Sequence, residues 1–154
     1  MKAKEIMTEP VITAQEDTTL EQIAQMMLEH RIGGVPVVDS EGRICGIVTE
    51  SDFTEKEKCV PFSTFRAPQL FGNWFSPEAV EKVYRAARQL AARDIMTRPV
   101  AAVTEDASVH EVMTQMVRHD VNRIPVLRDG RPVGIIARHD LLKMLVNRPA
   151  AVRQ

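Results

Sequence analysis

The sequence predicts an α/β protein built from two copies of one small unit. An Ile-Met-Thr-x-Pro-Val stretch at residues 6–11 returns at residues 95–100, 89 residues later. The Val-Pro-Val-Val run at 35–38 returns as Ile-Pro-Val-Leu at 124–127, again at 89, and the offset falls to 88 after the next turn. Helical and strand patterns also follow one another in the same order in each copy. Two copies in 154 residues imply a pseudo-two-fold molecule with paired, nearly equivalent clefts.

Each copy is expected to fold as strand, helix, strand, strand, helix. The first helix begins after Thr19, an N-cap that Gln22 can answer in a capping box, and Ser108 and Glu111 hold the same places in the second copy. Apolar residues then recur at i, i+3, i+4 and i+7, which predicts one buried helix face. These residues are Leu20, Ile23, Ala24, Met27 and, in the second copy, Val109, Val112, Met113, Met116. The methionines are therefore interpreted as core filler and not as metal ligands.

Short β-branched runs around glycine-containing turns predict an antiparallel hairpin in each copy. The predicted strands are Val35–Asp39, Ile44–Thr49, Ile124–Leu127 and Val133–Ala137. Asp52 and Asp140 follow the hairpins and are expected to be the N-caps of the closing helices. The apolar side of the second closing helix is expected to comprise Leu141, Leu142, Met144 and Leu145.

The composition excludes several classes of protein. With 44% apolar residues, 27% charged residues and a net charge of −1, the chain has a globular profile and lacks the basic excess of general nucleic-acid binders. It has no apolar run long enough for a membrane span and no room for a secretory signal before the first repeat. Two cysteines, Cys45 and Cys59, form no disulfide framework, so we expect a reducing cytoplasm. No phosphate-binding loop, zinc motif or catalytic triad stands out, so we expect neither a metal nor an enzyme.

The duplicated motifs together resemble a tandem pair of cystathionine-β-synthase (CBS) domains, often called a Bateman module. The resemblance rests on the two Ile-Met-Thr-x-Pro-Val openings, the two Val/Ile-Pro-Val hairpins, and Gly-Ile-Val-Thr-Glu-Ser-Asp and Gly-Ile-Ile-Ala-Arg-His-Asp. It implies two pseudo-symmetric β-α-β-β-α CBS repeats packed as a disc. The expected boundaries are 1–53 for the first repeat, 54–92 for an insert, 93–147 for the second repeat and 148–154 for a tail.

The resemblance also implies a function. Such pairs bind adenosine-containing ligands (AMP, ADP, ATP or S-adenosylmethionine) in clefts between the repeats, as regulatory ligands and not as catalytic cofactors. Ligand occupancy would reach a partner protein through a change in conformation, and the pair is expected to form a homodimer.

By resemblance, Asp52 with Thr49, and Asp140 in the second copy, would bind the ribose hydroxyls. The chemistry fits, because an ionised carboxylate only accepts hydrogen bonds and a vicinal diol offers two donors. The implied adenine pocket comprises Ile12, Thr13, Gly34, Val35, Pro36, Ala102, Val103, Ile124, Pro125 and Ala137. The basic side chains that could grip phosphate are His30, Arg31, Arg123, Arg138 and His139.

Simpler roles remain open for these residues. The aspartates can act as N-caps, the arginines can be ordinary solvated charges, and His30 and His119 can satisfy the last carbonyls of their helices. Ala137 stands where the motif has Thr or Ser and so removes a hydroxyl from the second cleft. The Thr49–Asp52 cleft is therefore the first choice.

The insert between the copies, together with Phe53 just before it, holds all seven aromatic residues of the chain. Ser76-Pro77-Glu78 predicts the start of a helix over about 77–91, because proline is favoured at the first helical position. The aromatics either pack on the disc or the following helix, or they form a patch for another subunit or protein. The expected patch is Phe62, Phe65, Phe71, Trp74 and Phe75. An alternative function is thus a protein-interaction or dimerisation module with empty clefts.

Overall fold

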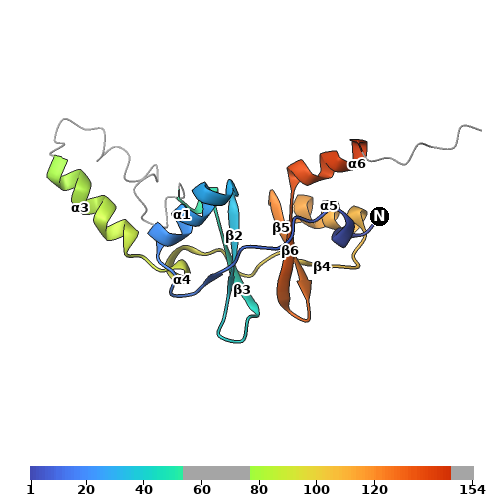
Figure 1. Ribbon diagram of the computed structural model, residues 1–154, viewed down its shortest axis with the longest axis horizontal. Coiled ribbons are helices and arrows are strands. Elements are labelled where there is room, and N and C mark those ends of the chain that lie inside the picture. Colours follow the sequence, from blue (N-terminus) through green and yellow to red (C-terminus); the bar gives the residue numbers. More distant parts are fainter. Residues whose placement is uncertain (54–76, 147–154) are drawn as a thin grey trace, which may run out of the picture. The chain divides into compact units, whose positions relative to one another are not determined.

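A computed structural model describes residues 1–53 and 77–146 of the chain (Figure 1). The chain is α/β, as predicted, with two three-stranded sheets. It divides into two compact units. We call Thr13–Val100 the central unit, and Met1–Ile12 together with Ala101–Gln154 the terminal unit.

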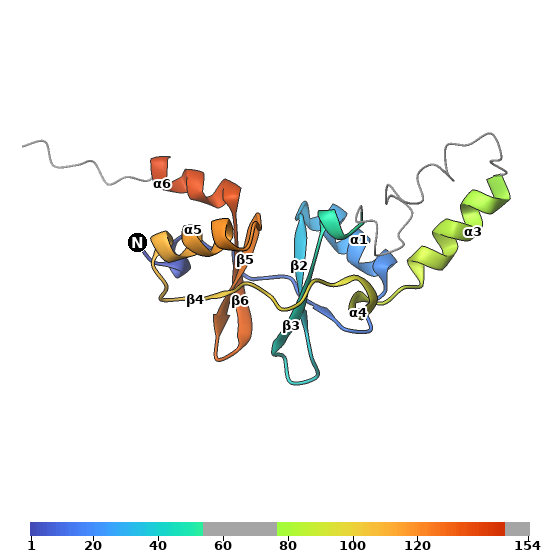
Figure 2. The same cartoon turned by 180° about the vertical axis from the view of Figure 1, so that it is seen from behind.

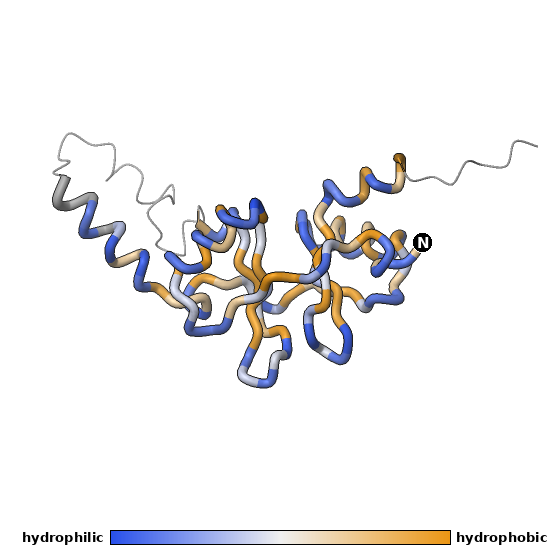
Figure 3. Tube along the Cα trace, viewed as in Figure 1, coloured by the Kyte–Doolittle hydropathy of each residue, from blue (hydrophilic) through white to orange (hydrophobic). Residues whose placement is uncertain are grey.

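The central unit contains one sheet in the order β1-β2-β3. Strand β1 runs parallel to β2, and β2 is antiparallel to β3, with Gly34 opposite Thr49. The elements of this unit are β1 (Ala14–Gln15), α1 (Leu20–His30), β2 (Gly34–Val38), β3 (Ile44–Thr49), η2 (Glu50–Phe53), α3 (Pro77–Arg88) and α4 (Ala92–Ile95). In Figure 3 the paired strands are largely hydrophobic, while the turn at the hairpin tip is hydrophilic.

The terminal unit repeats this topology with the order β4-β5-β6. Strand β4 is parallel to β5, and β5 is antiparallel to β6, with Arg123 opposite Ala137. Its elements, visible from behind in Figure 2, are η1 (Ala3–Glu5), β4 (Val103–Thr104), α5 (Val109–Arg118), β5 (Arg123–Arg128), β6 (Arg131–Ala137), η4 (Arg138–Leu142) and α6 (Lys143–Val146). Both predicted hairpins are present, with boundaries shifted by one or two residues.

The opening segments of the two repeats are exchanged between the units. The second Ile-Met-Thr segment lies in the central unit, where Ile47 and Thr97 exchange two backbone hydrogen bonds of 3.1 and 2.9 Å. The first segment lies in the terminal unit, where Thr8 and Ile135 do the same at 2.8 and 3.1 Å. Each sheet is thus completed by the opening of the other repeat.

A methionine from each exchanged segment packs against a glycine of the sheet. A β-carbon added at Gly46 would lie 2.3 Å from the Sδ of Met96, and one added at Gly134 would lie 2.3 Å from the Sδ of Met7. Met96 belongs to the buried cluster of the central unit, and Met7 packs against that of the terminal unit. At both glycines, an added side-chain carbon would therefore collide with the methionine of the exchanged segment.

The helix signals of the sequence are confirmed in part. Thr19 caps α1 and forms the reciprocal capping box with Gln22, and the hydroxyl of Ser108 accepts from the backbone N–H of Glu111 at 3.1 Å. Most of the predicted apolar face is buried, but Met113, at one edge of it, is 45% exposed. Leu142 and Leu145, expected on the apolar side of the closing helix, are also exposed, whereas Leu141 and Met144 pack against the core.

The expectation that Asp52 and Asp140 are N-caps is wrong by three residues. Each carboxylate accepts the backbone N–H of the residue three positions before it, Thr49 at 2.7 Å and Ala137 at 2.8 Å. Ala137 is the N-cap of η4, so Asp140 is the third helical residue and reaches back to the start of its own turn. An N-cap aspartate accepts the backbone N–H of a residue after it, whereas these two aspartates accept the backbone N–H of a residue before them.

The insert is described only from residue 77 onward. The expected helix over about 77–91 appears as α3, which ends at Arg88. The backbone N–H groups of Gln89 and Leu90 then donate to the carbonyls of Ala86 and Ala87. The predicted interaction patch, Phe62, Phe65, Phe71, Trp74 and Phe75, lies outside the described residues. Of the other aromatics, Phe53 packs against the central core, and Tyr84 lies with it along a small apolar cavity beside α1. No helix within the described ranges is long and apolar enough to cross a membrane.

Candidate functional site

The carboxylate of Asp52, here called the central carboxylate, is held at the end of β3. Asp52 is 1% exposed. One oxygen, Oδ2, accepts the backbone N–H of Thr49 at 2.7 Å and its hydroxyl at 3.4 Å. The other oxygen, Oδ1, accepts the hydroxyl of Thr97 at 2.9 Å. A buried ionised carboxylate is tolerated only when such donors replace water, so this cluster fixes the carboxylate in one orientation.

The carboxylate of Asp140, here called the terminal carboxylate, has the repeat-equivalent position but different partners. Asp140 is 7% exposed. Its Oδ2 accepts the backbone N–H of Ala137, and the hydroxyl of Thr8 lies 3.5 Å from its Oδ1. The ammonium of Lys143 lies 2.6 Å from the same Oδ1. The terminal carboxylate therefore lacks the hydroxyl that Thr49 offers to Oδ2 in the central unit and has a cation, from the first residue of α6, at its Oδ1.

The strands bring several of the predicted adenine-pocket residues next to these carboxylates. The start of β2, with Gly34, Val35 and Pro36, is buried and pairs with the end of β3. Glu50, which begins η2, donates its backbone N–H to Gly33 at 3.2 Å and so joins the two strand ends. In the terminal unit, Ile124 and Pro125 are buried opposite the end of β6, close to Ala137.

The remaining predicted pocket residues lie where the chain passes between units. Ile12 ends the first segment of the terminal unit and Thr13 begins the central unit. Ala102 and Val103 follow the second crossing between units, where the chain leaves the central unit at Val100 and enters the terminal unit at Ala101. Val103 pairs in parallel with Val126 of β5.

The basic residues predicted for the phosphate side differ in their placement. His30 ends α1, and Arg31 follows it as a C-cap in the left-handed region, with a φ of 52°. Arg123 begins β5 opposite Ala137 and is half-buried. Arg138 and His139 are exposed on η4, immediately before the terminal carboxylate. Only the terminal unit therefore brings predicted basic residues next to its carboxylate in sequence and in the sheet.

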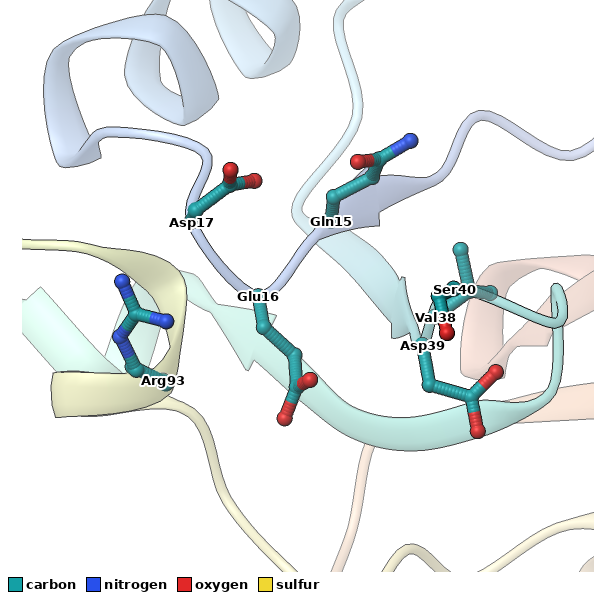
Figure 4. A pocket seen from close by; sticks show the side chains of 7 residues that line it. All are labelled: Gln15, Glu16, Asp17, Val38, Asp39, Ser40 and Arg93. Carbon is teal, nitrogen blue, oxygen red and sulfur yellow. The ribbon is translucent and has the colours of Figure 1, made fainter.

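A separate cavity of about 210 Å³ lies at the far ends of β1 and β2 in the central unit (Figure 4). Its charged side chains are Glu16, Asp17, Asp39 and Arg93. Neither this cavity nor the apolar one beside α1 is lined by a carboxylate of the predicted ribose site.

Glu105 and Asp106 of the terminal unit, which correspond to Glu16 and Asp17 of this cavity, form ion pairs with basic side chains. Glu105 forms a two-pronged pair with Arg128 at 2.9 and 2.6 Å, and Asp106 accepts from Lys2 and Lys4 at 3.0 and 2.9 Å. The hydrogen bond from Arg128 lowers the pKa of Glu105, and the bonds from Lys4 and Lys2 lower the pKa of Asp106. The two pairs with Asp106 link the first residues of the chain to the turn before α5.

Cys45 lies half-buried in β3, and its Sγ is 3.4 Å from the carbonyl oxygen of Val37. Burial raises the pKa of this thiol, and the charges of Glu16 and Asp39 add to the effect. A thiol with a raised pKa is a poor nucleophile and a poor metal ligand at neutral pH. Within residues 1–53 and 77–146, no group of three or more His, Cys, Asp or Glu side chains is arranged to hold a metal ion.

Comparison with known proteins decides the family. The CBS domain model matches residues 3–58 and again 92–147. The chain belongs to the CBS domain family. The CBS domain of a CBS domain-containing membrane protein from Sphaerobacter thermophilus is 43% identical, with a TM-score of 0.75 over 93% of this chain and 86% of that one. The CBS domain pair of protein MJ0100, solved with 5′-methylthioadenosine and S-adenosyl-L-methionine, is 25% identical, with a TM-score of 0.68 over 95% and 96% of the two chains.

Relatives differ in how much of their length this CBS pair spans. The uncharacterized protein MJ1426 of Methanocaldococcus jannaschii is 28% identical, and the match covers 95% of this chain and 92% of the relative. The inosine-5′-monophosphate dehydrogenase of the same organism is 29% identical, but the match covers only 23% of its length. In several other relatives it covers between 32 and 60%. The CBS pair thus occurs both nearly alone and as a part of larger chains.

Sequence reasoning missed three residues that contact the carboxylates. Thr97 and Thr8 were identified only as parts of a repeated motif, and their partners lie 45 and 132 residues away. Lys143 was not considered, although its spacing of three residues after Asp140 at the start of a helix is visible in the sequence.

Proposed function

We propose that this CBS pair is a non-catalytic regulatory module that binds an adenosine-containing ligand, such as AMP, ADP, ATP or S-adenosylmethionine, and passes its occupancy on to a partner. The observation that carries the proposal is the pair of buried, repeat-equivalent carboxylates at the ends of β3 and β6. An ionised carboxylate has room for about four donors. Each of the two already accepts a backbone N–H and has a threonine hydroxyl at its Oδ1, so a vicinal diol would displace that hydroxyl. A related CBS pair solved with two adenosyl compounds supports the ligand class.

The ribose role belongs to the central and terminal carboxylates, with Thr49 as the hydroxyl neighbour in the central unit. The buried starts of β2 and β5 would flank the base, and Arg123, Arg138 and His139 would face a phosphate tail. Binding acts on a partner only if the ligand has unequal affinity for two conformations of the chain.

A thermal-shift panel with AMP, ADP, ATP, NADH and S-adenosylmethionine tests this function. A ligand at about 100 times its dissociation constant adds about 2.7 kcal/mol of stability, which corresponds to a rise in Tm of about 5–10 °C for a chain of this size. Asp52→Asn keeps the shape of the side chain and removes its charge, so it should reduce the shift. Thr114→Ala, on the exposed side of α5, is the matched control. Tm values that no adenosyl compound changes refute the proposal.

A second candidate is self-association, which the exposed face of α5 favours. Met113 and Val117 lie one turn apart on this helix and are 45 and 78% exposed. The repeat-equivalent residue Ala24 of α1 lies instead beside Tyr84 and Ala87 of α3. A homodimer through α5 predicts that Met113→Glu with Val117→Glu halves the mass seen in light scattering, and an unchanged mass excludes this face.

A further inference from the structure

The described partners of the two Oδ1 atoms differ in charge. In the terminal unit, the ammonium of Lys143 lies 2.6 Å from Asp140 Oδ1. The equivalent Oδ1 of Asp52 accepts a neutral hydroxyl, that of Thr97, at 2.9 Å. The corresponding hydroxyl in the terminal unit, that of Thr8, is further away, at 3.5 Å.

Lys143 is a partly exposed cation and not a buried part of the core. Its side chain is 45% exposed, whereas that of Asp140 is 10% exposed. The ammonium also lies 3.4 Å from the carbonyl oxygen of Ile6 in the exchanged opening segment. By the 88-residue offset, the first repeat has Glu55 at this position, a residue of opposite charge that lies outside the described part of the chain.

We propose that Lys143 determines ligand charge specificity at the terminal carboxylate, which selects anionic adenosyl ligands over uncharged ones. This inference rests on the proposed binding of adenosyl compounds. A ribose diol that donates to Asp140 Oδ1 competes with the ammonium for the same oxygen. An uncharged adenosine leaves the displaced ammonium with only neutral partners, water and the carbonyl of Ile6, whereas a 5′-phosphate offers it a new anionic partner.

The expected size of the effect follows from the exposure of the pair. Ion pairs with one exposed partner contribute up to about 1 kcal/mol, and salt weakens them further. Loss of Lys143 should therefore change the preference for AMP over adenosine by about threefold to fivefold. The preference should also shrink as the salt concentration rises.

The test is titration calorimetry with adenosine and with AMP on the full chain and on Lys143→Met, Lys143→Arg and Asp140→Asn. The same variants are titrated again with Asp52→Asn, which weakens the central site. The ratio of the two dissociation constants should fall about threefold or more in Lys143→Met. It should be retained in Lys143→Arg, because arginine keeps the charge. In Asp140→Asn both compounds should bind more weakly but AMP should still be preferred, because Lys143 keeps its charge.

The outcomes separate this inference from the function on which it rests. If AMP binds the parent chain and Lys143→Met with an unchanged ratio, the role of Lys143 is refuted while adenosyl binding stands. If neither compound binds the parent chain, the role of Lys143 is refuted, and adenosyl binding is refuted with it when no compound of the thermal-shift panel changes the Tm. A melting temperature for each variant verifies that it folds, which is expected since Lys143 is half-exposed at the start of the short helix α6.

Discussion

Replacing Gly46 with alanine tests the contact that locks the exchanged segment onto the central sheet. The added β-carbon would lie 2.3 Å from the Sδ, 2.8 Å from the Cγ and 3.1 Å from the Cβ of Met96. Non-bonded carbon and sulfur atoms normally approach no closer than about 3.5 Å. The side chain of Met96 must therefore move by more than about 1 Å, or the segment that carries it must shift.

The cost follows from how little room Met96 has. This side chain is 7% exposed and lies in the buried cluster with Val37, Val48 and Ile95. The neighbouring residues are fixed by the paired hydrogen bonds between Ile47 and Thr97. Overpacking a site of this kind typically costs about 1–3 kcal/mol of unfolding free energy. The expected fall in Tm is about 3–10 °C.

Circular dichroism melts of Gly46→Ala, Met96→Ala and the double variant measure the cost. Met96→Ala leaves a cavity and should itself cost about 2–5 kcal/mol. Because it also removes the Sδ and Cγ that clash, the double variant should be more stable than the sum of the two losses by about 1 kcal/mol. Gly134→Ala, which meets Met7 at the same three distances, provides an internal replicate. Strictly additive losses in the double variant would show that the two side chains do not compete for space.

The other predictions concern single groups. Thr97→Val should lower the free energy of unfolding in urea by about 1–2 kcal/mol, because it removes a donor from the central carboxylate. Thr97→Ser should retain most of the stability. Equal losses in both variants would show that the hydroxyl bond to Asp52 does not stabilise the fold. In a Cys59→Ser background, Cys45 should react with Ellman's reagent more slowly than a free cysteine at pH 8, because its pKa is raised, and should match the free thiol once unfolded. The carboxyl of Asp106 should titrate by NMR below its usual pKa. Its contribution to the free energy of unfolding is therefore present above about pH 4 and disappears as the pH falls through the lowered pKa. Lys4→Gln should raise that midpoint, and an unmoved midpoint contradicts the pair.

Local signals in the sequence determined the elements well. The capping box of Thr19 and Gln22 and the two glycine-turn hairpins are confirmed, because each depends on residues a few positions apart. Met113 shows the limit of periodicity. Its spacing fits the apolar face of α5 as well as that of Val112 does, but Val112 is fully buried and Met113 is 45% exposed. Periodicity does not tell which edge of an apolar face the rest of the fold covers.

The surroundings of the carboxylates were harder to predict, since they depend on which repeat supplies which segment. The duplication predicts two equivalent sites, and the structure gives two equivalent, buried aspartates. The duplication does not reveal that the hydroxyl partner of Asp52 comes from the second Ile-Met-Thr motif, or that Thr8 lies beside Asp140. The two motifs are nearly identical, so the sequence does not tell which motif pairs with which sheet. The Lys143–Asp140 pair could have been predicted, because the two residues are three positions apart in the sequence at the start of a helix.

The exchange of opening segments gives the carboxylates a direct connection to the chain that joins the units. Thr97, which donates to the central carboxylate, stands three residues before the passage between Val100 and Ala101. Thr8, beside the terminal carboxylate, stands four residues before the passage between Ile12 and Thr13. A ligand that takes over an aspartate oxygen competes with these hydroxyls. If a ligand binds as proposed, it would therefore act first on the two segments through which one unit is covalently joined to the other.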